Sequence, residues 1–314
     1  MPPKISIIIP VYNEEKNVEE LFRQIERSLD NYQYTYEVIF VNDGSTDNTW
    51  NIIKGLNKSS KTLTGIDLSV NFGQSSALSA GIDHASGEYI VTMDGDLQND
   101  PNDIPDMIKK IDSEDWDLIA GIRTNRKDGF IFRRFPSILA NFLIRTSTGV
   151  RFKDYGCTLK AFKSDIAKDL DLYGELHRFI PVLVHLQGAR ITQMNVNHRA
   201  RVHGKSKYGI SRTLRVMSDL LLMLFFKKYL QKPMHLFGTI GIIIFFIGII
   251  INFYLVFLKI LGQDIWGKPL LMLGIMLTLG GVQLITIGIL AELLMRTYYE
   301  SQKKKPYKIK NILQ

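Results

Sequence analysis

Residues 89–96 read YIVTMDGD, an apolar run that ends in two aspartates separated by one glycine. Such a run is typical of a strand buried in a sheet. Asp94 and Asp96 stand where this strand would end. Hard cations such as Mg²⁺ and Mn²⁺ prefer oxygen ligands, and one or two carboxylates suffice when substrate phosphates complete the shell. A divalent-metal site is one interpretation of this pattern, and a tight turn, which Asp and Gly also favour, is the other.

Short apolar segments alternate with segments of helical spacing through the first 120 residues. Ile- and Val-rich runs predict strands over residues 4–10, 37–41, 63–68, 89–93 and 117–120. Periodic apolar residues predict helices over residues 14–29, 46–56, 74–85 and 102–111. This alternation predicts an α/β fold with a mostly parallel, Rossmann-like sheet covered by helices on both faces.

Three of the predicted strands end in polar or acidic segments, at residues 10–15, 41–47 and 94–98. In parallel sheets, ligands bind beyond the carboxyl ends of the strands. Asn13 could instead cap the first helix, and Ser45 or Thr46 could cap the second. Capping does not require Asp43 as well, nor acidic groups at neighbouring strand ends. The pattern therefore favours a metal-nucleotide site over separate caps.

Two long stretches near the C-terminus, residues 236–258 and 269–291, contain no charged residue. Each would form a helix about 35 Å long, enough to cross a hydrocarbon core of about 30 Å. We therefore expect two transmembrane helices. The N-terminal apolar run is too short for a signal peptide and leads directly into Asn13 and Glu14.

Basic residues flank both apolar stretches. The chain has a net charge of +8, with nine Lys or Arg and one acid between residues 199 and 232. The positive-inside rule predicts a cell-membrane protein with the N-terminal α/β part and both termini in the cytoplasm. Nucleic acid is the alternative partner for a basic chain, but attraction to anionic headgroups explains charge beside membrane spans more simply. The single cysteine, Cys157, allows no internal disulfide and fits a reducing compartment.

Several motifs together resemble family 2 glycosyltransferases with the GT-A fold. These motifs are residues 10–15, 41–47, 94–98, 120–123, 154–162, 177–181 and 197–208. With two C-terminal spans, the chain is similar to the polyprenyl-phosphate glycosyltransferases, which include dolichol-phosphate mannose synthase and bactoprenol glucosyltransferases. The resemblance covers essentially the whole chain.

The resemblance implies roles for the residues at the strand ends. The nucleotide would be bound by Pro10, Tyr12, Glu14, Asp43, Asp94, Gly95 and Asp96. Asp94, Asp96 and Gln98 would surround a Mg²⁺ or Mn²⁺ ion and the diphosphate. Transfer of a sugar from a nucleoside diphosphate builds negative charge on the leaving group, which a divalent ion stabilises.

The acceptor implied by the resemblance is a polyprenyl phosphate. A phosphate monoester is mostly dianionic at neutral pH, so no strong base is needed. Positive charge is needed instead, and the family positions that engage phosphates are Arg123, Arg133, Ser137, Arg201 and Lys207. For each cation, a solvated surface position is the alternative. Asp154 matches a recurrent family acid that could orient Lys160 or the arginines, or act as a base.

Two segments suit a lipid acceptor. Residues 130–146 and 210–230 mix apolar side chains with arginines, as interfacial helices do. Ordinary amphipathic helices packed on the sheet are the alternative. The expected organisation is a GT-A domain over residues 1–209, a juxtamembrane region over 210–232, two transmembrane helices over 233–295 and a basic tail over 296–314.

The resulting hypothesis is an inverting, metal-dependent hexosyltransferase that moves one sugar from a nucleotide sugar to polyprenyl phosphate. UDP-glucose is the first expected donor and GDP-mannose the second. A processive polysaccharide synthase is the alternative within enzymes, and a non-catalytic membrane subunit or flippase is the alternative in another class. The bactoprenol relatives suggest a homo-oligomer such as a tetramer, and glycines on both spans permit close helix packing.

Overall fold

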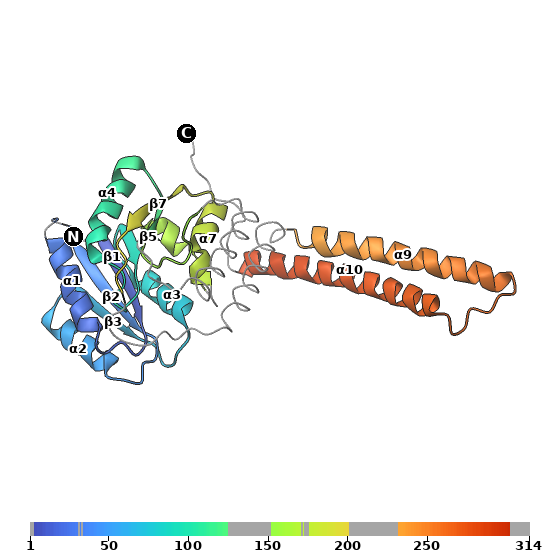
Figure 1. Cartoon of the computed structure of the whole chain (residues 1–314), viewed down its shortest axis with the longest axis horizontal. Helices are drawn as coiled ribbons and strands as arrows, with labels where there is room; N and C mark the ends of the chain where they lie inside the picture. The colour runs from blue at the N-terminus through green and yellow to red at the C-terminus, as the bar shows by residue number, and fades with distance from the viewer. Residues whose placement is uncertain are drawn as a thin grey trace. The chain divides into compact units, whose positions relative to one another are not determined.

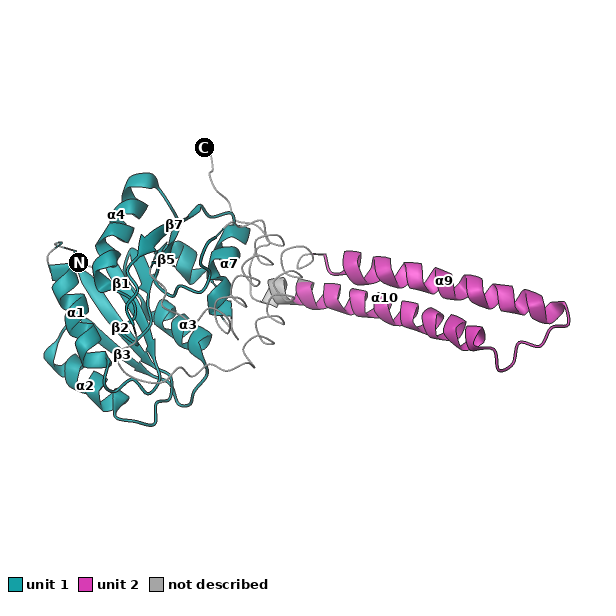
Figure 2. Cartoon of the chain, viewed as in Figure 1, with its two compact units in different colours: residues 1–221 teal, residues 222–314 magenta. Residues whose placement is uncertain are grey.

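The chain forms two compact units, residues 1–221 and residues 222–314 (Figure 2). The computed structural model describes residues 3–30, 32, 34–124, 152–170, 172, 176–200 and 232–301. The segments expected to be interfacial, 130–146 and 210–230, lie outside these residues. The four-part division expected from the sequence therefore stays a prediction.

A seven-stranded sheet forms the centre of the first unit, with strand order β3-β2-β1-β4-β6-β5-β7 (Figure 1). The strands are β1 (Ile5–Val11), β2 (Tyr36–Asn42), β3 (Leu63–Asp67), β4 (Tyr89–Thr92), β5 (Leu118–Arg123), β6 (Lys160–Lys163) and β7 (Ile191–Val196). The pairs β1–β2, β1–β4, β2–β3 and β5–β7 are parallel. Only β6, inserted between β4 and β5, pairs antiparallel with its neighbours in this described sheet. The prediction of a mostly parallel α/β sheet is confirmed.

Helices cover both faces of the sheet. They are α1 (Val18–Asp30), α2 (Thr49–Ser59), α3 (Gln74–His84), α4 (Ile104–Glu114), α6 (Ser164–Lys168) and α7 (Ile180–Leu186), with short 3₁₀ turns η1 (Pro101–Asp103) and η3 (Leu176–Phe179). Apolar side chains of α1 and α4 pack with the odd-numbered residues of β1, which share one face of the strand. Gly81 of α3 lies against Ile8 and Val41 on the opposite face.

The helical spacing of α1 explains how it attaches to the sheet. Its buried side chains, Val18, Leu21, Phe22, Ile25 and Leu29, recur every three or four residues and so share one face of the helix. This face joins the β1 residues in one continuous hydrophobic core. The core fixes the strands whose ends carry the polar segments.

The second unit is a pair of antiparallel helices, α9 (Met234–Ile260) and α10 (Pro269–Ser301) (Figure 1). Over residues 234–260 and 269–295, both are long and apolar enough to cross a membrane. Glycines let the two backbones approach closely: a Cβ on Gly281 would lie 2.5 Å from the backbone nitrogen of Phe245. Asn252 Nδ2 donates a hydrogen bond to Thr278 Oγ1 at 3.1 Å, which links the helices through polar groups.

Candidate functional site

The carboxyl ends of β1, β2 and β4 meet at one edge of the sheet, because these strands are adjacent and parallel. Pro10 lies near the end of β1, and Tyr12 and Glu14 follow this strand. Asp43 follows β2, and Asp94 and Asp96 follow β4. The structure thus brings together the strand-end residues that the sequence singled out.

The loops after β1 and β2 are fastened to each other by side chains. Asn13 donates its backbone N–H to Ser45 Oγ at 2.9 Å, and its Oδ1 accepts the backbone N–H of Thr46 at 2.8 Å. Asn13 has a φ of 54°, a left-handed conformation that Asn tolerates better than most residues. It lies well before the first residue of α1, so its role is to join two loops rather than to cap a helix.

Glu14 and Asp43 are both held in place. Glu14 accepts a hydrogen bond from Asn17 Nδ2 at 2.6 Å. Asp43, 5 % exposed, accepts the backbone N–H groups of Phe72 and Gly73 at 2.8 and 3.0 Å. Asp43 therefore fixes the segment between β3 and α3 beside the loop after β2. Its proposed contact with the nucleotide stays a prediction, for which each carboxylate oxygen retains a further lone pair.

Asp94 and Asp96 form a compact acidic pair. Asp94 Oδ1 accepts a hydrogen bond from Gln74 Nε2 at 2.8 Å. Burial, together with the negative charge of Asp96, raises the pKa of Asp94 to about 6. Gly95 packs closely against β1: a Cβ at this position would lie 2.6 Å from Val11 Cγ1, so a larger residue would force a shift.

A divalent cation fits this pair. Two carboxylates whose charges disfavour each other are stabilised by a positive ion, and their oxygens are the ligands that Mg²⁺ and Mn²⁺ prefer. Within the described residues, no cluster of three His, Cys, Asp or Glu side chains forms a metal cage. Two protein carboxylates completed by substrate phosphates match the way Mg²⁺ usually binds. Gln98 Nε2 donates to the backbone oxygen of Arg199 at 3.3 Å, so this amide also ties the loop to residue 199.

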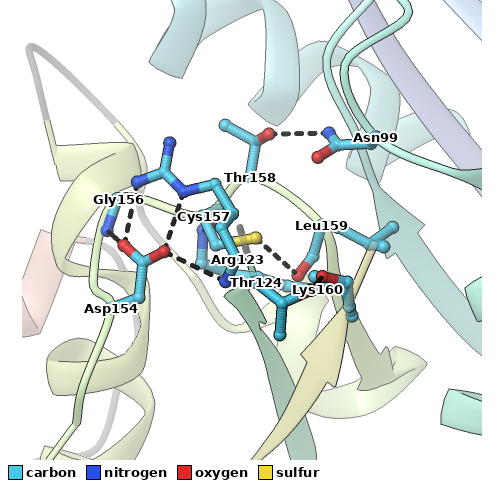
Figure 3. A network of polar contacts seen from close by, with 10 residues as sticks. Asn99, Arg123, Thr124, Asp154, Gly156, Cys157, Thr158, Leu159 and Lys160 are labelled. Atoms are coloured by element: carbon cyan, nitrogen blue, oxygen red, sulfur yellow. Dashed lines mark hydrogen bonds and ion pairs between the residues drawn. The ribbon is translucent and has the colours of Figure 1, made fainter. Parts of the chain in front are cut away.

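Arg123 and Asp154 form a bidentate ion pair near the end of β5 (Figure 3). Arg123 Nε and Nη2 donate to the two carboxylate oxygens at 2.7 and 2.9 Å. Asp154 also accepts the backbone N–H of Gly156 at 3.1 Å. Both carboxylate oxygens are thus engaged, and this geometry favours orientation of Arg123 as the role of Asp154.

Lys160 and His177 were not singled out by sequence reasoning as binding residues. Lys160, 3 % exposed, donates from Nζ to the backbone oxygen of Cys157, and burial lowers the pKa of its ammonium group. His177 is also buried, with Nδ1 2.9 Å from Ser75 Oγ. Both line a cavity that also contacts Asp94. Lys160 lies within a motif that the sequence highlighted, but only burial beside Asp94 gives it a site role.

Four predicted phosphate-binding residues lie outside the described part of the chain. They are Arg133, Ser137, Arg201 and Lys207. Arg199, two residues before Arg201, donates from Nη2 to Asp100 Oδ2 at 2.6 Å. The proposed roles of the four residues stay predictions.

Comparison with known proteins shows the family of the chain. The model of glycosyl transferase family 2 matches residues 6–171, more than half of the chain. The chain belongs to glycosyl transferase family 2. The matched range includes all three acidic strand ends, Arg123 and Asp154.

Two curated relatives match nearly the whole chain. Dodecaprenyl-phosphate galacturonate synthase of Rhizobium johnstonii is 46% identical over 313 residues, which cover 98% of this chain and 93% of the relative. Undecaprenyl-phosphate 4-deoxy-4-formamido-L-arabinose transferase of Shewanella sediminis is 34% identical and covers 98% of this chain and 92% of the relative. The expected resemblance to polyprenyl-phosphate glycosyltransferases is confirmed.

Solved structures confirm the GT-A-like fold. Glucosyl-3-phosphoglycerate synthase from Mycobacterium tuberculosis, in complex with Mn²⁺, UDP and phosphoglyceric acid, aligns with a TM-score of 0.56 at 18% identity. The alignment covers 72% of this chain and 78% of that structure. At this identity the similarity concerns the arrangement of strands and helices.

Proposed function

We propose that this family 2 enzyme transfers one sugar from a nucleotide sugar to a polyprenyl phosphate. The observation that carries the proposal is the acidic pair Asp94 and Asp96 in the same unit as the oriented cation Arg123. The acidic pair suits a metal-bound leaving diphosphate, whereas an oriented guanidinium suits a phosphate nucleophile. The names of both curated relatives, each a polyprenyl-phosphate enzyme, support this assignment.

The donor proposed here is UDP-galacturonic acid. The sequence alone favoured UDP-glucose, with GDP-mannose second, but neither of the two curated relatives is named for glucose or mannose. The relative at 46% identity is named for galacturonate. UDP-glucose and GDP-mannose are therefore the competing donors in the test.

The proposed chemistry is a single displacement. A phosphate oxygen of the acceptor attacks the anomeric carbon of the sugar as the bond from that carbon to the diphosphate oxygen breaks. The electron pair of that bond leaves with the diphosphate, and the configuration inverts. Because the acceptor oxygen is already ionised near pH 7, Asp154 serves to hold Arg123 rather than to remove a proton.

Asp94 and Asp96 would hold Mg²⁺ or Mn²⁺. When bound, the ion stabilises negative charge on the leaving diphosphate. Arg123 gathers phosphate charge, and its planar fork is fixed by Asp154 before substrate arrives, which lowers the entropic cost of binding. The buried strand ends hold these groups rigidly.

The two apolar helices support a location in the membrane, where the acceptor resides. We propose that the catalytic unit and both termini face the cytoplasm, because the basic residues flank the outer ends of the helix pair. A homo-oligomer remains part of the proposal. A two-helix hairpin is too small to form the longer membrane channel that a processive synthase needs.

The test incubates purified full-length protein with Mn²⁺, undecaprenyl phosphate and each of UDP-galacturonic acid, UDP-glucose and GDP-mannose. Mass spectrometry of the lipid is expected to show one added uronic acid. Asp96→Asn is expected to lower turnover about 100-fold to 1,000-fold, since it removes a charged metal ligand. Asp106→Asn, an exposed aspartate on α4, is the matched control.

Three outcomes would contradict the proposal. No glycolipid with any donor favours the non-catalytic subunit, and a ladder of sugars favours the processive synthase. Full activity in a folded Asp96→Asn protein would remove the metal-diphosphate role of the acidic pair.

A further inference from the structure

A narrow cavity lies beside Asp94 in the first unit. Apolar side chains line it together with the polar side chains of Gln74, Thr158, Lys160 and His177. Its volume is about 10 Å³, room for about one water-sized group. Pockets that enclose a whole ligand usually measure roughly 300–1,000 Å³. The cavity therefore suits one small polar group of a substrate, such as a single oxygen of a substituent, rather than a complete nucleotide sugar.

Lys160 brings a positive charge to this cavity. An ammonium group has three N–H donors. Within the part of the chain that the structure describes, Lys160 Nζ makes one hydrogen bond, to the backbone oxygen of Cys157. A buried ammonium is costly unless negative groups face it. Asp94 and Asp154 supply negative charge nearby, but Asp154 is paired with Arg123 and Asp94 is assigned to the metal.

His177 contributes a second polar side chain to the lining. Ser75 Oγ accepts the backbone N–H of His177 at 3.1 Å and lies 2.9 Å from Nδ1 of the ring. The cavity thus combines the Lys160 cation with polar side chains, a combination that suits an oxygen-bearing anionic group.

The position of the cavity identifies which part of the substrate can reach it. In the proposed function, the diphosphate is bound at Asp94 and Asp96, and the sugar is attached directly to that diphosphate. Asp94 also lines the cavity. A substituent of the sugar is therefore the part of the donor closest to Lys160, apart from the phosphate itself.

We propose that Lys160 is a specificity-determining residue that binds the carboxylate of a uronic-acid sugar in the donor. This inference rests on the proposed function, whose donor it explains. A neutral hexose carries a hydroxymethyl group in place of the carboxylate and leaves the buried cation without its anionic partner. Sites built to bind a polar group discriminate strongly against analogues that lack it, because the buried donors stay unpaired.

The test compares UDP-galacturonic acid with UDP-galactose, which differs only at that substituent. The wild-type protein, Lys160→Gln and Lys160→Arg are assayed for kcat/KM with both donors, Mn²⁺ and undecaprenyl phosphate. Lys160→Gln is expected to reduce the preference for the uronic acid about 100-fold, and Lys160→Arg to restore most of it. Lys163→Gln is the matched control, because Lys163 is on the same strand but pairs with Asp115 and Asp117 at 2.7 and 3.1 Å.

Calorimetric titration separates the sugar from the phosphate as the source of the anion. With Mn²⁺ present, Lys160→Gln is expected to weaken the binding of UDP-galacturonic acid but not the binding of UDP. An equal loss of affinity for both ligands would mean that Lys160 binds the diphosphate and would overturn the inference. Thermal unfolding of each variant checks that the fold is retained, and Lys160→Met provides a second variant if Lys160→Gln does not fold.

The inference and the proposed function fail in different ways. The inference is overturned, and the proposed function stands, if the enzyme transfers galactose or glucose and the Lys160 variants leave the ratio of kcat/KM between the two donors unchanged. Lys160-dependent binding of UDP-galacturonic acid without any transfer to the lipid keeps the inference and overturns the function.

Discussion

Arg123 and Asp154 illustrate how geometry assigns roles that residue type leaves open. An aspartate near an active site can be a base or a partner for a cation. The two hydrogen bonds of 2.7 and 2.9 Å between Arg123 and Asp154 make the second role the better supported one. A partly buried, bidentate pair also loses more than one contact when either partner is removed.

A double-mutant cycle tests the positioning role of Asp154. Arg123→Gln and Asp154→Asn are each expected to lower kcat/KM about 10-fold or more. The double variant is expected to be little worse than the worse single variant, because both changes remove the same oriented guanidinium. Sugar transfer to undecaprenyl phosphate measures each kcat/KM. Additive losses, together with a loss of the acid limb of the pH–rate profile in Asp154→Asn alone, would instead identify Asp154 as a base.

The acidic pair and the cavity differ in how readily a sequence predicts them. Asp94 and Asp96 stand directly after an apolar strand, so their place at the sheet edge follows from the pattern. Lys160 begins a short strand that ends in Lys163, and residue type alone does not show which of these two lysines is buried. Strand pairing on both sides of β6 determines which lysine lies beside Asp94.

Among the elements, the five predicted strands and four predicted helices of the N-terminal region are all present, with ends that differ by a few residues. Their apolar periodicity is strong because each packs one full face on the core. The strands β6 and β7 were missed. β6 has four residues, and β7 carries polar residues within ITQMNV, so neither gives a clear apolar signal.

The helix pair α9–α10 depends on its glycines. A Cβ on Gly281 would meet backbone atoms of Phe245 at 2.5 and 2.6 Å, whereas a Cβ on the adjacent Gly280 would meet no atom within 4 Å. Gly281→Val is therefore expected to separate the helices and destabilise the pair by about 1–3 kcal/mol. Thermal unfolding in detergent measures this loss as a lower midpoint.

Gly280→Val is the matched control for that experiment. It makes the same chemical change one residue away, on a surface free of contact within the described chain. Equal midpoints for the two variants would show that close backbone contact does not hold the helices together. A larger effect of Gly280→Val would point to contact with another copy at that surface.

For the whole molecule, the orientation in the membrane can be measured with a single introduced cysteine. Native Cys157 is buried, and burial raises the pKa of its thiol to about 11. At pH 7.5, below this pKa, the thiol stays neutral and reacts slowly with maleimides. Gln263→Cys, between the two helices, is expected to react with an impermeant maleimide in intact cells. Gln314→Cys is expected to react only after permeabilisation.

Wild-type protein is the control for background labelling of Cys157. Labelling of Gln314→Cys, but not of Gln263→Cys, in intact cells would reverse the proposed orientation. Labelling of neither position before permeabilisation would mean that the helix pair does not expose its loop outside.

The sequence by itself determined the fold class, the acidic strand ends and the two apolar helices, because each depends on local composition and periodicity. It did not determine which residues share a site across long separations. Tertiary structure placed β6 between β4 and β5, paired Arg123 with Asp154, and buried Lys160 and His177 in the cavity that Asp94 also lines. These contacts arise from strand order and packing, which bring together side chains that no local pattern connects.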